Sequence, residues 1–240
     1  ANCYVGNDIS ADYSHDEMPI YGEQMPEAVC LPASTAEVAA IMMLCNDNKI
    51  PVTVRGAGTG LVGGATPLFG GVVLCTMRMD RILYYDMNNL RVHVQPGVRL
   101  CDLAADALEH DLMYPPDPGE KTGSLGGNVS TNAGGMRAVK YGTTRDYVLA
   151  MTVVLPNGQI LELGRSVTKT SSGYSLLHLM IGSEGTLGVI TELTLKLIPN
   201  PKEDISFMLP FADIDAAISA VPKIKLAGLS PQSIEFMERD

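Results

Sequence analysis

The stretch Val54-Arg-Gly-Ala-Gly-Thr-Gly-Leu-Val-Gly-Gly-Ala65 decides how this chain folds. Its residues 58–63 fit the pattern G-x-G-x-x-G, and Asp80 lies near the distance at which a dinucleotide-binding fold places its ribose ligand. In that fold the pattern must open a helix. Here Pro67 and further glycines occupy the place of the helix, and a predicted strand resumes at Val72. The sequence therefore predicts a wrapped anion-binding loop without a helix behind it.

Glycines gather in three windows along the chain. Of the 24 glycines, seven lie in the first window (residues 56–71), six in the second (residues 115–135) and three in the third (residues 182–190). Glycine permits positive φ and exposes backbone N–H groups to a bulky anion. A single window of this kind more often marks a surface turn. Three windows in one acidic chain favour a site for a diphosphate.

The second window combines a proline-rich entry with small neutral side chains. Residues 115–118 read Pro-Pro-Asp-Pro, and Ser124, Ser130 and other hydroxyl and amide side chains follow. Such groups offer uncharged donors and acceptors, which suit a ring edge or a sugar-alcohol chain. The third window continues directly into a predicted strand, whose main chain could serve a base or a ring.

Composition places the chain among acidic globular proteins. Hydrophobic residues make up 46% of the 240 residues, charged residues 18%, and the net charge is −10. That balance argues against nucleic-acid binding, which needs clustered Lys and Arg. The longest apolar stretches, such as residues 150–155, are too short to cross a bilayer. The five cysteines are odd in number and lack C-x-x-C spacing, so we expect a reducing cytoplasm.

A β-α-β unit is predicted for residues 26–76. Ser34 and Glu37 fit a capping box, and an apolar helical stripe follows. Short apolar runs at residues 52–54 and 72–76 read as strands. The stripe consists of Val38, Ile41, Met42 and Cys45.

A mainly antiparallel sheet with added helices is predicted for residues 81–198. Two pairs of predicted strands read as hairpins. The first pair is residues 82–86 and 91–95, with Asn88-Asn89 between them, and the second is residues 148–155 and 159–163, with Pro-Asn-Gly between them. Between the two hairpins an apolar stripe predicts a helix. A further strand near the end of this segment is predicted from apolar residues that alternate with polar ones, and prolines end it. The stripe is Leu100, Leu103, Ala104, Ala107 and Leu108; the strand sets Leu193, Leu195 and Leu197 against Glu192, Thr194 and Lys196, before Pro199 and Pro201.

The last segment reads as the opening of another domain. Residues 206–211 and 234–237 are predicted strands, and Asp213 is the predicted N-cap of a helix between them. So short a unit cannot bury its own apolar face. The predicted organisation is therefore one subdomain over residues 1–80, a second over 81–200 and the start of a truncated substrate or cap domain over 201–240.

The glycine windows also carry a family resemblance. The chain resembles the N-terminal half of the glycolate oxidase D-subunit and D-lactate dehydrogenase group, within the vanillyl-alcohol-oxidase (PCMH-type) flavoproteins. The resemblance implies an α+β, PCMH-type FAD-binding fold of two α+β subdomains, with FAD in the cleft between them. The matching segments are residues 54–65, Val94-Gln-Pro-Gly-Val98, Pro115-Pro-Asp-Pro118, Gly126-Gly-Asn-Val129, Asn132-Ala-Gly-Gly135, Lys140-Tyr-Gly142 and Gly182-Ser-Glu-Gly-Thr-Leu-Gly-Val189.

The resemblance implies a role for each window in cofactor binding. The pyrophosphate would lie against Gly56, Ala57, Gly58, Thr59 and Gly60, in a loop shaped by Gly63, Gly64 and Ala65. The flavin and ribitol would be lined by Pro116, Asp117, Thr122, Gly126, Gly127, Asn128, Thr131, Asn132, Gly134 and Gly135. Gly185, Val189 and Ile190 would contact the adenine or dinucleotide side, and Arg55, Tyr141, Gly142, Glu184 and Gly188 complete the set. Relatives that attach FAD covalently often carry histidine where this chain has Thr59, so we expect non-covalent FAD.

The implied activity is oxidation of a small D-2-hydroxy acid, of the glycolate or D-lactate type, with hydride transfer to flavin N5. In the resembling enzymes the base, the metal ligands and the carboxylate-binding Arg lie in the C-terminal half, so no catalytic residue is assigned and the fragment alone is expected to be inactive. A separate electron acceptor would be an iron–sulfur subunit, an electron-transfer flavoprotein or a quinone. Two alternatives stay open: a non-catalytic FAD- or nucleotide-binding module of a larger redox complex, and an NADPH-dependent reductase of the enolpyruvyl-UDP-sugar type.

Charged and titratable side chains near the windows give less specific signals. The four histidines, His15, His93, His110 and His178, show no ligand spacing, so no metal site is predicted and each is interpreted as structural or solvent-facing. Four cations surround the predicted site: Arg55, Arg137, Lys140 and Arg145. Lys140 or Arg137 could stabilise a reduced, anionic flavin, although ordinary surface charge explains them equally well.

Overall fold

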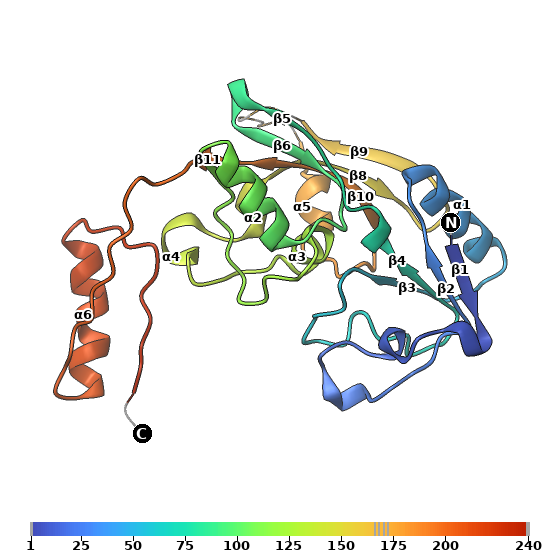
Figure 1. Cartoon of the computed structure of the whole chain (residues 1–240), viewed down its shortest axis with the longest axis horizontal. Helices are drawn as coiled ribbons and strands as arrows, with labels where there is room; N and C mark the ends of the chain where they lie inside the picture. Colours follow the sequence, from blue (N-terminus) through green and yellow to red (C-terminus); the bar gives the residue numbers. More distant parts are fainter. Residues whose placement is uncertain (1, 166, 168, 170, 172, 239–240) are drawn as a thin grey trace.

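A computed structural model describes residues 2–165, 167, 169, 171 and 173–238. It has two larger β-sheets with helices packed on them, a two-stranded sheet, and a C-terminal helix that stands apart (Figure 1). Short 3-10 turns occur at Gly6–Asp8, Ala11–Ser14, Pro19–Tyr21, Thr76–Arg78, Met87–Asn89 and Thr144–Tyr147.

The first sheet has four strands in the order β1-β2-β4-β3. Strands β2 (Ala28–Leu31) and β3 (Val52–Arg55) both pair in parallel with β4 (Val72–Cys75), and β1 (Asn2–Val5) is antiparallel to β2. Helix α1 (Thr35–Asp47) connects β2 to β3. The predicted β-α-β unit is thus present, with β4 inserted between its two strands.

Helix α1 follows the predicted cap and stripe. The Ser34 hydroxyl accepts from the Glu37 N–H at 3.3 Å, while the Glu37 carboxylate accepts from the Ala33 N–H at 2.8 Å, one residue before the expected N-cap. Val38 and Met42 are buried and pack with Leu74 of the first sheet and with Val154 and Val189 of the second sheet. The apolar face of α1 therefore joins the two sheets.

The second sheet has five strands in the order β5-β6-β10-β8-β9, and every pair in it is antiparallel. Both predicted hairpins are confirmed. The strands are β5 (Ile82–Asp86), β6 (Arg91–Val94), β8 (Val148–Val154), β9 (Ile160–Gly164) and β10 (Val189–Lys196). A two-stranded ladder joins β7 (Leu112–Met113) to β11 (Ile198–Pro199), so Pro199 takes part in a strand rather than ending one.

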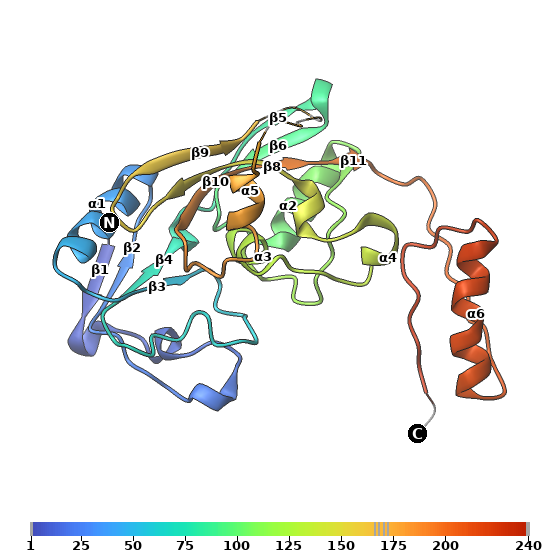
Figure 2. The ribbon, with the colours of Figure 1, turned by 180° about the vertical axis from the view of Figure 1, so that it is seen from behind.

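Helices α2 (Leu100–Glu109), α3 (Leu125–Thr131) and α5 (Leu176–Met180) lie on the same side of the second sheet (Figures 1 and 2). Leu103, Leu125 and Leu177 from these helices share one core with strand residues such as Leu195. The short helix α4 (Ala138–Tyr141) follows α3. This core holds the second window, which includes α3, against the sheet.

Two details of the predicted faces differ from the structure. Thr194, predicted on the wet face of β10, is 6% exposed, and its hydroxyl lies 3.1 Å from Nδ1 of His93, which satisfies it. On α2, Ala104 and Leu108 are exposed, so the buried stripe is narrower than predicted. Local periodicity could not reveal either outcome, because both depend on which neighbouring element covers the position.

The last described segment contains helix α6 (Ile214–Leu226) and no strand. The Asp213 carboxylate accepts from the Ala216 N–H at 2.8 Å, which confirms the predicted N-cap. The strands predicted for residues 206–211 and 234–237 are wrong: both segments run outside any ladder that the described residues form. Figures 1 and 2 show α6 and its flanking chain away from both sheets, so no sheet edge is available there.

We expect Leu195→Ala to lower the free energy of unfolding by about 2–5 kcal/mol, because it leaves a cavity in the core under the second sheet. Leu195 is 0% exposed, whereas Leu108 is 55% exposed. Leu108→Ala is therefore the matched control, with an expected change within about 0.5 kcal/mol. Urea titration of both variants followed by circular dichroism measures the difference, and equal losses would contradict the assigned core.

Candidate cofactor-binding site

The first window is a loop between the parallel strands β3 and β4. No helix interrupts its sixteen-residue course in the structure, as the sequence predicts. Gly58 and Gly63 each have φ +80°, a left-handed conformation that side chains with a Cβ rarely adopt. The loop therefore turns its main chain sharply, and its N–H groups are not used by a helix.

Residues near the N-terminus support this loop from outside. Arg55 is buried, and its Nη1 donates to the His15 carbonyl at 2.5 Å. The Glu17 N–H donates to the Gly60 carbonyl at 2.9 Å, and the Ala65 N–H donates to Asp16 Oδ2 at 3.5 Å. Asp16 was not among the predicted site residues; it is 4% exposed, and its sequence neighbourhood carries no motif that marks it.

The first and second windows pack closely, with glycine main chain of each window beside a hydroxyl side chain of the other. A Cβ on Gly56 would collide with Oγ of Ser124, and a Cβ on Gly123 would lie 3.4 Å from Oγ1 of Thr59. Ser124 is the N-cap of α3, where its hydroxyl accepts from the Gly127 N–H at 3.2 Å. The start of α3 thus lies directly against the start of the glycine loop.

Two buried polar groups in these windows lack protein partners. Within the described residues, neither Nδ2 of Asn128 nor Oγ1 of Thr66 makes a hydrogen bond, although the two residues are only 8% and 4% exposed. Leaving such a group unpaired costs about 1–3 kcal/mol. A ligand that supplies oxygen or nitrogen acceptors would remove that cost, so the donor set fits a polar cofactor.

The third window contacts the second through its main chain and the first through the Glu184 side chain. The Glu184 N–H donates to the Ser130 carbonyl at 2.9 Å, and the Gly182 N–H donates to the Val129 carbonyl at 3.0 Å. A Cβ on Gly64 would lie 3.3 Å from Oε2 of Glu184. All three windows, distant in sequence, therefore lie against one another.

Some predicted contact residues have their side chains elsewhere. Val189 and Ile190 are buried in the hydrophobic cores, so only their main chain is available to a ligand. A Cβ on Gly188 would meet Val153 and Val154, so this glycine permits close pairing of β10 with β8. Tyr141 packs partly against the core under the second sheet. Their cofactor contacts remain predictions.

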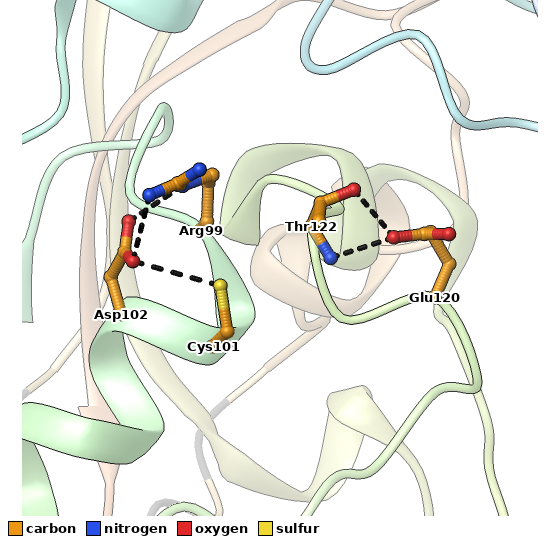
Figure 3. A network of polar contacts seen from close by, with 5 residues as sticks. All are labelled: Arg99, Cys101, Asp102, Glu120 and Thr122. Carbon is orange, nitrogen blue, oxygen red and sulfur yellow. Dashed lines mark hydrogen bonds and ion pairs between the residues drawn. The ribbon is translucent and has the colours of Figure 1, made fainter.

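Thr122 is engaged with a neighbour at the surface. Its hydroxyl and its N–H both donate to Oε1 of Glu120, at 2.5 and 2.7 Å, beside the ion pair of Arg99 with Asp102 (Figure 3). These hydrogen bonds hold the pKa of the Glu120 carboxyl below its usual value. Because Thr122 is exposed, its predicted flavin contact has no support from this geometry.

Asn132 fixes the turn between α3 and α4. Its Oδ1 accepts from the Thr143 hydroxyl at 3.2 Å and from the Arg145 N–H at 3.0 Å, while its backbone has φ +49°. The Thr131 hydroxyl donates to the Gly127 carbonyl at 3.1 Å. Gly142 lies against the carboxylate of Asp146. These contacts order the second window from within.

The Asp117 carboxylate lies near two cationic side chains at the edge of the site. Its carboxylate forms an ion pair with Lys121 and lies 3.6 Å from Nε of Arg137. A Cβ on Gly135 would meet the Asp117 carbonyl, so the two ends of the second window touch. Arg137 is thus partly compensated by Asp117, whereas Nζ of Lys140 lies 5.1 Å from the Tyr141 ring centroid.

The histidines occupy four separate places. His15 lies beside the first window, with Nδ1 3.0 Å from the Ser14 hydroxyl, and His93 stacks on Tyr84 at 4.0 Å. Burial lowers the pKa of His93. His110 contacts Tyr85, and His178 lies on α5. In the part of the chain that the structure describes, no three His, Cys, Asp or Glu side chains gather as metal ligands would, and no helix is long and apolar enough to cross a membrane.

Comparison with known proteins gives one family match and many relatives. A family model described as "FAD binding domain" matches residues 26–164. The chain is 60% identical over 236 residues to a D-lactate dehydrogenase of Anaerostipes hadrus, covering 98% of this chain and 50% of that protein. It is 42% identical over 228 residues to the glycolate oxidase subunit GlcD of Bacillus subtilis, covering 95% and 48%. The chain thus spans about half the length of these relatives.

Solved structures share the fold. An alkyldihydroxyacetonephosphate synthase superposes with a TM-score of 0.76 at 26% identity, covering 87% of this chain and 38% of that one. The 6-hydroxy-D-nicotine oxidase of Arthrobacter nicotinovorans gives a TM-score of 0.71 at 23% identity, covering 82% and 42%. The α+β arrangement of two sheets around the glycine windows is therefore a known architecture, as the sequence predicts.

We expect Gly58→Ala to weaken FAD binding at least tenfold, about 1.4 kcal/mol, because its Cβ would push the Arg55 guanidinium and strain the loop at φ +80°. Gly158→Ala is the matched control, since Gly158 has φ +81° in the β8–β9 turn, outside the windows. Both variants should lose about 1–2 kcal/mol of stability. Fluorescence titration of FAD should separate them; equal affinities would contradict the loop assignment.

Proposed function

The chain belongs to the FAD-binding domain family, whose model matches residues 26–164, and from this premise we propose that it binds FAD non-covalently and forms the flavin-binding portion of a D-2-hydroxy-acid dehydrogenase or oxidase. The proposal is supported by the contacts among the three glycine windows, together with the buried Nδ2 of Asn128 in the second window, which makes no hydrogen bond within the described residues. Main-chain N–H groups without flanking side chains suit a diphosphate, and the neutral second window suits the ribitol and ring.

The residues of this chain bind, orient and enclose the cofactor. Gly56, Gly58 and Gly60 offer N–H groups to the pyrophosphate, with the Arg55 guanidinium behind them. Asn128 lies beside Gly123, which packs near Thr59 of the first window, and Glu184 of the third window lies near Gly64 of the first. Thr131 lies on the same helix as Asn128. When bound, FAD would supply the redox chemistry as a hydride acceptor, while the protein would supply position and charge.

The substrate class rests on the names of the relatives. One is a D-lactate dehydrogenase and another a glycolate oxidase subunit, and both act in name on small 2-hydroxy acids. We infer the same class for the protein that contains this chain. The word subunit in the second name favours a separate electron acceptor, such as an iron–sulfur subunit, an electron-transfer flavoprotein or a quinone. Five free thiols fit a reducing cytoplasm.

The same name supports a second candidate function. A glycolate oxidase subunit works by its name within an assembly, so the chain could serve as a FAD-binding module of a larger redox complex without turnover of its own. The two candidates share the FAD site and differ only in whether a hydroxy acid reaches the flavin.

We expect the purified chain, incubated with FAD and desalted, to show a flavin absorption spectrum. Acid precipitation should then release all the flavin into the supernatant, because Thr59 carries no ring nitrogen to form a covalent link. Bovine serum albumin treated identically controls for carry-over. A colourless chain would contradict the proposed cofactor, and a yellow pellet would contradict non-covalent attachment.

We expect D-lactate or glycolate, added without oxygen, to leave the flavin of this chain oxidised, because the base and substrate groups are inferred to lie in the remaining half of the relatives' length. In a longer protein that contains both this chain and the remaining half of the relatives' length, D-lactate should bleach the flavin absorbance and L-lactate should not. Absorbance of the flavin measures both. Bleaching by NADPH instead would favour the enolpyruvyl-reductase alternative, and no bleaching by any hydroxy acid would favour the binding module.

A further inference from the structure

Two cysteines face each other across the edge of the first sheet. Cys3 of β1 pairs with Cys30 of β2 in the antiparallel register, and their Sγ atoms lie 2.9 Å apart. Cys3 is exposed, whereas Cys30 is 8% exposed. The other cysteines lie on three different elements: Cys45 on α1, Cys75 on β4 and Cys101 on α2.

The backbone geometry of this pair suits a disulfide. Directly opposed residues in an antiparallel ladder have Cα atoms about 4.5–5.5 Å apart. That range falls inside the interval of about 4.4–6.8 Å observed for disulfide bonds. Rotation of the two side chains therefore suffices to bring the sulfur atoms into bonding distance, with the ladder left intact.

We propose that Cys3 and Cys30 are a redox modification site, which a small-molecule disulfide such as oxidised glutathione closes into a cross-strand disulfide that fastens β1 to the sheet. The Cys3 thiolate attacks one sulfur of the oxidant and releases one thiolate. Cys30 then attacks the Cys3 sulfur, its proton passes to the second departing thiolate, and the oxidant leaves as two thiols. The protein loses two electrons and two protons, which the oxidant gains.

The environment assigns the order of these two steps. Burial and the hydrogen bond with Cys3 raise the pKa of Cys30 to about 12, so Cys30 remains a thiol at neutral pH. Cys3 is exposed and is therefore the residue that a dissolved oxidant reaches first. Cys30 attacks second, when the mixed disulfide on Cys3 already lies opposite it.

The bond would act on the glycine loop through the N-terminal segment. All four residues of β1 are exposed, and β1 lies at the outer edge of its sheet, so its ladder with β2 is its main attachment. The chain then passes through the 3-10 turns Gly6–Asp8 and Ala11–Ser14, with Ile9 buried between them, to His15, Asp16 and Glu17, which bond to Arg55, Ala65 and Gly60. Fastening β1 thus limits fraying of the segment that supports the first window.

The first experiment tests the bond itself. After incubation with oxidised glutathione and removal of the reagent, the chain should have three titratable thiols instead of five, and digestion should yield one peptide pair linked through Cys3 and Cys30. Cys3→Ser should lose no thiol pair, whereas the matched control Cys101→Ser should form the same bond as the unaltered chain. A stable glutathione adduct on Cys3, or a bond that includes another cysteine, would overturn the proposal.

The second experiment tests the consequence. Closure should raise the thermal midpoint by about 5–10 °C, because it closes a loop of 27 residues. It should also slow FAD release about threefold or more, an effect that rests on the proposed function, and Cys3→Ser should show neither change. If the chain never binds FAD, the proposed function is refuted, and the thermal shift alone then tests the disulfide proposal. Closure without any thermal shift would refute the fastening of β1.

Discussion

The site depends on the close approach of glycine main chain to neighbouring atoms, which only a residue without a Cβ permits. Gly56 lies against Ser124, Gly135 against the Asp117 carbonyl, and Gly71 against the Pro51 carbonyl. At each of these places a methyl group would overlap a neighbouring atom. These close contacts hold the glycine windows in place, and the rest of the structure supports them.

The two sheets supply that support through a shared core. The buried face of α1 contacts Leu74 in the first sheet and Val154 and Val189 in the second sheet, so the sheets cannot move apart without exposing it. Each window continues from an element of this core: the first from β3, the second through α3, and the third into β10. A flavin between the sheets would therefore contact both subdomains, and its binding would stabilise their relative arrangement.

Several charged groups near the site are engaged within the protein. Asp117 is paired with Lys121 and lies near Arg137, and the Arg55 guanidinium is held by the His15 carbonyl. The windows therefore offer oriented N–H dipoles more than free cations. This matches the division of labour proposed above, in which the chain positions the cofactor and the groups that handle the substrate's proton and carboxylate lie in the other half of the longer relatives.

The sequence by itself determined the local elements and the chemical character of the windows. Ser34 and the stripe after it predicted α1, the Pro-Asn-Gly turn predicted the β8–β9 hairpin, and Pro67 with its glycines excluded a Rossmann helix, because caps, turns and backbone freedom act over a few residues. Only the tertiary structure decided that Asp16 lies beneath the loop, that Thr194 is buried against His93, that Cys3 faces Cys30, and that residues 206–211 form no strand. Those outcomes depend on which distant segment covers a residue or pairs with it in a sheet. Such long-range contacts produce no periodic pattern in the sequence.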